Sequence, residues 1–170
     1  TGSDRDIDID AVHAIVEDAF AKVFTGRIEN DDFNRLVLAA RLSADDSVIL
    51  RAYARYLRQI GFALSQSFIE QTLAAHGDIA AALVKLFRVR FDPAAPADAE
   101  GAEARQFSAI EAALDGVANL SEDRVLRQLL ALVLATTRTN FWCTDAAGAR
   151  RTFLSFKLDP SKIPGVPEPR

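Results

Sequence analysis

The distribution of proline most constrains what this chain can fold into. All six prolines lie in two places: positions 93 and 96, and positions 160, 164, 167 and 169. Proline lacks a backbone N–H and clashes with the preceding helical turn, so helix interiors exclude it. Residues 1–92 and 97–159 carry none. We therefore expect a mainly α fold with one internal linker and a proline-rich exit.

Apolar residues recur at helical spacing along both proline-free stretches. The first stripe begins at Val12 and the last ends at Val133, and together they predict a bundle of about seven helices. Further on, residues 141–144 and 152–158 have the composition of strands, and residues 145–148 between them favour a turn. We expect a C-terminal β-hairpin or strand pair there.

The predicted organisation has six parts. They are a tag remnant with a disordered lead (1–7), a first helical group (8–91), a linker (92–101), a second helical group (102–139), a β-hairpin (140–159) and an extended exit (160–170). The chain contains no methionine and begins Thr-Gly-Ser, as the remnant of a cleaved expression tag does. We therefore expect a piece of a longer protein.

Capping residues mark the predicted helix ends. Ser43 followed by Asp46 resembles a capping box with Asp in place of Glu. Gly61 and Gly77 follow helical stripes, where a glycine can adopt positive φ. Asp78 is expected to cap the next helix.

Three acidic pairs resemble carboxylates for acid–base chemistry, but all fall at predicted helix starts. They are Asp31 and Asp32, Asp45 and Asp46, and Glu122 and Asp123. There they satisfy N–H groups and complement the helix dipole, so we interpret them as caps. The run from Asp6 to Glu17 resembles a calcium loop, but Ala11 stands where the loop needs glycine.

Two histidines and one cysteine are the other candidates for chemistry. His13 and Glu17 lie one turn apart but would need further metal ligands, which the spacing does not supply. His76 lies at a helix end, and Cys143 lies among aromatic residues, where we expect a small buried hydrophobe. The sequence has no glycine-rich phosphate loop or nucleophile elbow. We therefore assign no catalytic, cofactor-binding or metal-binding residue.

Two groups of side chains form a candidate interdomain surface. Three arginines lie at i, i+4 and i+7 on one predicted helix, and four aromatic residues belong to the predicted hairpin. The residues are Arg51, Arg55, Arg58, Phe141, Trp142, Phe153 and Phe156. The arginines could instead bind phosphate, or form a solvated face paired with acidic neighbours.

Charge, hydropathy and cysteine content limit the partners and the compartment. The net charge of −4 gives no global reason to expect nucleic acid. No apolar run approaches the roughly 20 residues of a membrane span. The single cysteine rules out an internal disulfide framework and suits a reducing compartment. We expect a protein of a reducing compartment that binds neither membrane nor nucleic acid.

Five segments carry a family resemblance. They are FNRLVLAA (33–40), LRAYARYLRQ (50–59), GF with SQSFIE (61–70), LATTRTNF (134–141) and LSFKLDPSKIP (154–164). In this order and spacing they closely resemble the large NAD-specific glutamate dehydrogenases of bacteria. The resemblance runs from about Asp31 to Arg170 and is weaker in residues 92–104.

The resemblance implies a very long cytoplasmic chain that forms homo-oligomers and oxidises L-glutamate to 2-oxoglutarate and ammonia with NAD. It places this chain in the interior helical region just before the catalytic domain. There the chain would couple regulatory modules to that domain or support oligomerisation.

The family's catalytic lysine, glycine-rich substrate motif and dinucleotide fingerprint would lie beyond Arg170, so no catalytic residue is carried over. Lys157 and Lys162 lack the glycine-rich context and are not assigned that role. Alone, the chain should be inactive and bind no NAD. The alternative is a stand-alone helical interaction domain that binds nucleic acid through the arginine face.

Overall fold

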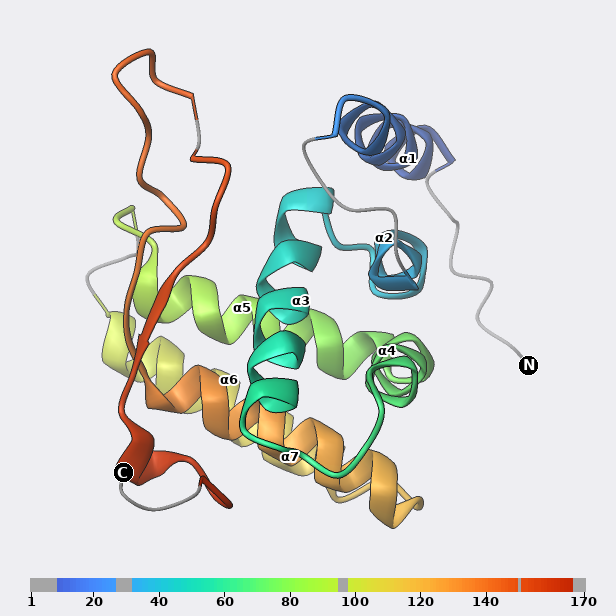
Figure 1. Ribbon diagram of the computed structural model, residues 1–170. Helices are drawn as coiled ribbons and strands as arrows, with labels where there is room; N and C mark the ends of the chain where they lie inside the picture. The colour runs from blue at the N-terminus through green and yellow to red at the C-terminus, as the bar shows by residue number, and fades with distance from the viewer. Residues whose placement is uncertain (1–8, 27–31, 95–97, 150, 167–170) are drawn as a thin grey trace.

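The chain is described here by a computed structural model that covers residues 9–26, 32–94, 98–149 and 151–166. Within these ranges it forms seven α-helices, two strands and two short 3-10 helices (Figure 1). The elements are α1 (Ile9–Phe24), η1 (Asp32–Arg35), α2 (Leu36–Ala39), α3 (Ala44–Gln59), α4 (Gln66–Ala75), α5 (Gly77–Phe91), α6 (Ala99–Leu114), α7 (Leu120–Ala135), β1 (Thr136–Thr139), β2 (Phe156–Leu158) and η2 (Pro160–Lys162). The predicted mainly α fold is confirmed. The predicted tag remnant, residues 1–7, lies outside the described residues.

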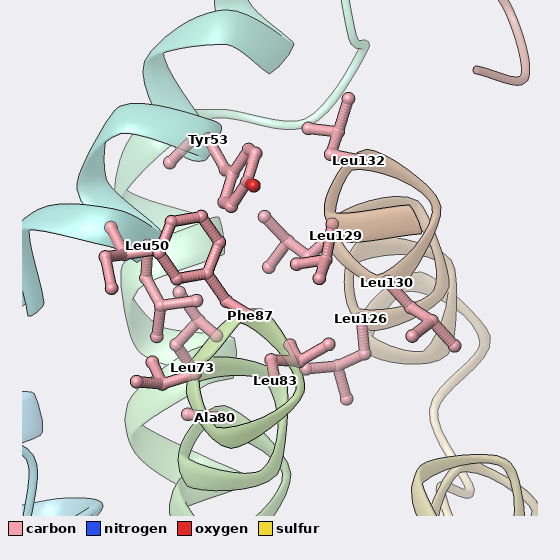
Figure 2. Packing of buried hydrophobic residues seen from close by; sticks show 14 of the residues in the cluster. Leu50, Tyr53, Leu73, Ala80, Leu83, Phe87, Leu126, Leu129, Leu130 and Leu132 are labelled. Carbon is pink, nitrogen blue, oxygen red and sulfur yellow. The ribbon is translucent and has the colours of Figure 1, made fainter. Parts of the chain in front are cut away.

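The main core lies where α3 runs across α5 and α7 (Figure 1). Figure 2 shows Tyr53 of α3, Leu83 and Phe87 of α5, and Leu126 and Leu129 of α7 packed together, and all five side chains are fully buried. The same cluster includes Leu114 of α6 and Ile163 beyond η2. Residues on both sides of the predicted linker therefore share one core.

Helix α1 lies apart from this main core (Figure 1). It packs against α2 and α3 through a second, small cluster. The members of that cluster are Ala19, Val37 and Ala44, with Ile15, Val23 and Val48 beside them. The contact leaves much of α1 open to solvent.

The predicted start of α3 and the glycine that ends it are confirmed. The Ser43 hydroxyl accepts a hydrogen bond from the Asp46 N–H at 3.1 Å and donates to the Asp46 carboxylate at 2.8 Å. Gly61 has a φ of 76°, as a glycine just past a helix end often does. Ser65 likewise caps α4 by accepting from the Phe68 N–H at 3.2 Å.

The predicted roles of Gly77 and Asp78 are wrong. Gly77 does not adopt positive φ but is the first residue of α5, and Asp78 lies inside the first turn instead of capping it. A Cβ at Gly77 would overlap the Ala39 carbonyl oxygen and lie 2.7 Å from its carbon. Glycine is required there because α2 approaches the start of α5 closely.

The predicted strand pair is confirmed, but its first strand lies elsewhere. β1 follows α7 directly and pairs antiparallel with β2, with Thr139 opposite Phe156. The second helical group was expected to continue to residue 139, and residues 141–144 were expected to form the strand. Three threonines among the four residues of β1 favour extended backbone, which ends α7 at Ala135.

The predicted turn at 145–148 is confirmed as the tip of the hairpin. The Asp145 carboxylate accepts from the Ala147 and Ala149 N–H groups, both at 2.9 Å, and Gly148 has a φ of 78°. We name the chain between β1 and β2, residues 140–149 and 151–155, the hairpin arm. Asn140 links its two sides, because its side chain accepts a hydrogen bond from the Ser155 N–H and donates one to the Phe153 carbonyl. The arm extends beyond the helices (Figure 1).

Candidate interdomain surface

Three of the four predicted surface aromatics point inward. Phe156 stacks on Tyr53 with ring centroids 4.4 Å apart, and Trp142 stacks on Phe87 at 5.6 Å. Phe141 meets the Phe87 ring edge-on at 5.8 Å and is only 8% exposed. We name these five residues the aromatic joint. Their contacts connect α3 and α5 with the hairpin arm and β2.

The fourth aromatic, Phe153, remains on the surface. Its side chain is 59% exposed, and the Arg151 guanidinium carbon lies 5.8 Å from its ring centroid. Phe153 and Phe156 line an open groove of about 770 Å³ together with Arg51 and Arg55. Four of the seven predicted residues therefore lie around one groove, which separates α3 from the hairpin arm.

The predicted arginine face is not continuous, because Arg51 is buried. Its side chain is 3% exposed and donates to the Asn34 side-chain oxygen at 3.2 Å, with its guanidinium carbon 5.5 Å from the Phe33 ring centroid. A planar guanidinium suits such a stacked, partly apolar position. Arg55 and Arg58 are exposed. Two exposed arginines make a weaker nucleic-acid surface than the three expected.

Tyr53 is the polar member of the aromatic joint. The Thr136 hydroxyl donates to the Leu132 carbonyl, so the Tyr53 hydroxyl is the donor in its 2.7 Å bond to Thr136. Burial raises the pKa of Tyr53 above its ordinary value, and the Thr136 bond and the charge of Arg90 only partly oppose this. Tyr53 therefore stays neutral and serves as a structural link between α3 and the start of β1.

Two polar links between distant helices were not predicted. Arg88 of α5 donates twice to one Asp46 carboxylate oxygen, at 2.7 and 3.0 Å. His76, at the start of α5, lies 2.8 Å from the Glu122 carboxylate of α7. Sequence spacing carried no signal for either pair, because both connect residues more than 40 positions apart.

The acidic pairs fall in first turns where the structure describes them. Asp45 and Asp46 lie in the first turn of α3, and Glu122 and Asp123 in that of α7. The cap of α7 itself is Asn119, whose side chain accepts from two N–H groups. Asp31 and the start of the calcium-like run lie outside the described residues.

The predicted burial of Cys143 is wrong, because the thiol is exposed on the hairpin arm. His13 lies 3.5 Å from Glu17, and both side chains face solvent. Across the described residues, no three His, Cys, Asp or Glu side chains gather as a metal site would require. None of the described helices is long and apolar enough to cross a membrane.

Two segments of the chain match models of known protein families. A family model described as glutamate dehydrogenase, helical motif 3, matches residues 28–93. A second, described as the catalytic domain of bacterial NAD-glutamate dehydrogenase, matches residues 109–170. The chain belongs to the bacterial NAD-specific glutamate dehydrogenases. The start of the catalytic-domain match therefore lies within the chain, whereas the sequence predicted the domain to follow it.

Curated NAD-specific glutamate dehydrogenases match most of the chain. The Pseudomonas aeruginosa enzyme is 47% identical over 96% of this chain, and the match covers 10% of that enzyme. The Halomonas elongata enzyme is 43% identical over 89% of the chain and the Mycobacterium tuberculosis enzyme 42% over 90%, covering 9% and 10% of those enzymes. The chain therefore spans about a tenth of the length of these glutamate dehydrogenases.

Proposed function

We propose that this chain is a non-catalytic segment of an NAD-dependent glutamate dehydrogenase that holds the helical region against the start of the catalytic domain. The full-length enzyme would oxidise L-glutamate to 2-oxoglutarate and ammonia, and its NAD and glutamate sites would lie outside this chain. The names of the relatives support this activity.

The aromatic joint is the observation that carries the proposal. Tyr53 and Phe87 lie in the helical-motif match, and Phe141, Trp142 and Phe156 lie in the catalytic-domain match. Phe87 alone contacts the rings of all four other members. Packed interiors transmit displacement because they contain few voids. A shift of the helical motif would therefore move the start of the catalytic domain with it.

The partners we propose are the other domains of the same polypeptide and further copies of it in a cytoplasmic homo-oligomer. The family description numbers this helical motif as the third. We place the earlier motifs of the polypeptide ahead of residue 28. Arg58 and Phe153 are exposed, which supports contacts with such domains.

The test replaces the centre of the joint from the helical side. In the full-length enzyme, Phe87→Leu keeps an apolar side chain but removes the ring that all other members contact. We expect kcat with glutamate and NAD to fall at least threefold. Phe107→Leu, the same exchange on the outer part of α6, should leave kcat within 1.5-fold.

Two results would contradict the proposal. In the first, the Phe87→Leu enzyme loses thermal stability, which shows that the aromatic joint was loosened, but its kcat, KM and oligomer mass are unchanged. The other is glutamate-dependent NADH formation by the 170-residue chain alone, because that would make the segment catalytic.

A further inference from the structure

Helix α1 carries a second apolar face that nothing in the described residues covers. Val16, Phe20 and Phe24 follow one another at i, i+4 and i+8 and form a ridge along the helix. Their side chains are 40%, 72% and 83% exposed, and the two phenylalanine rings stack with centroids 6.3 Å apart. We name these three residues the α1 ridge.

The ridge is distinct from the face by which α1 binds the rest of the chain. That other face consists of Ile15, Ala19 and Val23 and packs on α2 and α3. A helix with one partner needs an apolar stripe about 100° wide, and α1 has a wider one. Neighbouring exposed phenylalanines on one ridge are typical of a docking surface.

Polar side chains on α1 near the ridge contact one another or Asp45 of α3. His13 lies 3.5 Å from Glu17, and the Lys22 ammonium lies 2.8 Å from Asp18 and 3.0 Å from Asp45. The ridge itself is therefore apolar, which favours an apolar patch on another protein domain over an anion or nucleic acid.

We propose that the α1 ridge is the docking seat for the domain that precedes the helical motif in the same polypeptide. This rests on the proposed function, which makes the chain an interior segment. The matches cover about a tenth of the relatives, so most of the polypeptide lies outside this structure. α1 itself lies ahead of the helical-motif match, which begins at residue 28.

The position of α1 favours the preceding part of the polypeptide over the following part. α1 contacts α2 and α3 at one end of the molecule, whereas η2, near the C-terminal end of the described residues, packs on α7 at the other (Figure 1). α1 therefore contacts one domain through each apolar face and acts as an adaptor helix. A second copy of the chain is the competing occupant, and the experiment separates the two.

The experiment places a photo-crosslinker on the ridge of the full-length enzyme. Phe24→p-benzoylphenylalanine preserves an aromatic side chain at an exposed site, so the fold should tolerate it. We expect crosslinked peptides, identified by mass spectrometry, that join position 24 to sequence ahead of the helical motif in the same chain. The matched control, Ala14→p-benzoylphenylalanine, lies on the exposed polar side of α1 and should give at least tenfold less product.

Mixed oligomers of isotopically light and heavy subunits distinguish contacts within and between copies. Adducts that join light to heavy chains would overturn the proposal in favour of a second copy. If position 24 gives no more crosslinked product than position 14, the proposal is overturned, because no domain would then cover the ridge. Because the readout is a contact and not a rate, it stays informative even if the Phe87→Leu enzyme shows that the joint does not affect catalysis.

Discussion

Gly77→Ala should destabilise the protein, although adding a methyl group to a helical glycine usually stabilises it. Gly77 is the first residue of α5 and has no positive φ, so backbone conformation alone would permit alanine. The obstacle is the close approach of α2. The added Cβ would overlap the Ala39 carbonyl oxygen, and it would lie 2.7 Å from the carbonyl carbon and 3.2 Å from the Ala40 Cα.

The size of the effect follows from two opposing contributions. Adding a methylene to a well-packed site costs about 1–3 kcal/mol, and the upper part of that range applies because backbone atoms cannot rotate away. Helix propensity returns up to about 1 kcal/mol, and less in a first turn. The net loss is about 2 kcal/mol. For a domain of this size that corresponds to a fall in Tm of about 4–8 °C.

The assay is thermal and urea unfolding of the 170-residue chain, with Gly116→Ala as the matched control. At Gly116 the nearest atom to an added Cβ is the Ala113 carbonyl oxygen at 3.4 Å, which is ordinary contact. That control should be neutral or about 0.5 kcal/mol more stable, because alanine restricts the unfolded chain. A Gly77→Ala protein as stable as the control would refute the close-approach argument.

Three further predictions concern single polar contacts. Tyr53→Phe should cost about 1 kcal/mol at pH 7 by removing the bond to Thr136. Above pH 10 the unfolded tyrosine ionises while buried Tyr53 stays neutral, so the unfolding free energy of the unsubstituted protein falls as pH rises. The difference in unfolding free energy between it and Tyr53→Phe should therefore narrow. A constant difference in urea unfolding across pH 8–11 would contradict this. A double-mutant cycle of Asp46→Ala and Arg88→Ala should give a coupling energy of about 1 kcal/mol, since Arg88 is partly exposed, and a value near zero would reduce the pair to a surface contact. Ser65→Ala should cost about 1 kcal/mol in the same assay as a lost cap of α4, and no change would mean that water replaces the cap.

Local sequence predicted the features that depend on a few neighbouring residues. The number of helices followed from apolar spacing, and the start of α3 followed from Ser43 and its partner three positions on. The glycine at 61 and the turn at 145–148 followed from backbone conformations that few residues adopt. In each case the interacting groups lie within about four positions of one another.

The features that were missed depend on which distant segment lies alongside. The need for glycine at position 77 comes from the close approach of α2. Arg51 is buried because it packs against Phe33 and Asn34. Cys143 is exposed because the hairpin arm extends away from the helices. The spacing of apolar residues shows which side of a helix is buried, but it does not show which distant segment packs against that side. The same limit hid the pairing of Arg88 with Asp46.

The candidate surface shows this limit most clearly. The aromatic residues of the hairpin were predicted to face another domain, but three of the four face their own core. Their direction depends on the register of β1 with β2, and the sequence placed the first strand five residues too late. With Thr139 opposite Phe156, the Phe156 ring stacks on Tyr53 of α3.

The boundary between the two family matches does not divide the folded unit. Between residues 93 and 109 neither family model matches, and the prolines at 93 and 96 mark the same place in the sequence. Yet Phe87, before that boundary, is buried against rings that lie after it. Ending the chain at the boundary would expose this ring and the α7-facing side of α5 to water. The helical motif and the start of the catalytic domain therefore fold as one unit, and domain borders drawn from sequence families cut through its core.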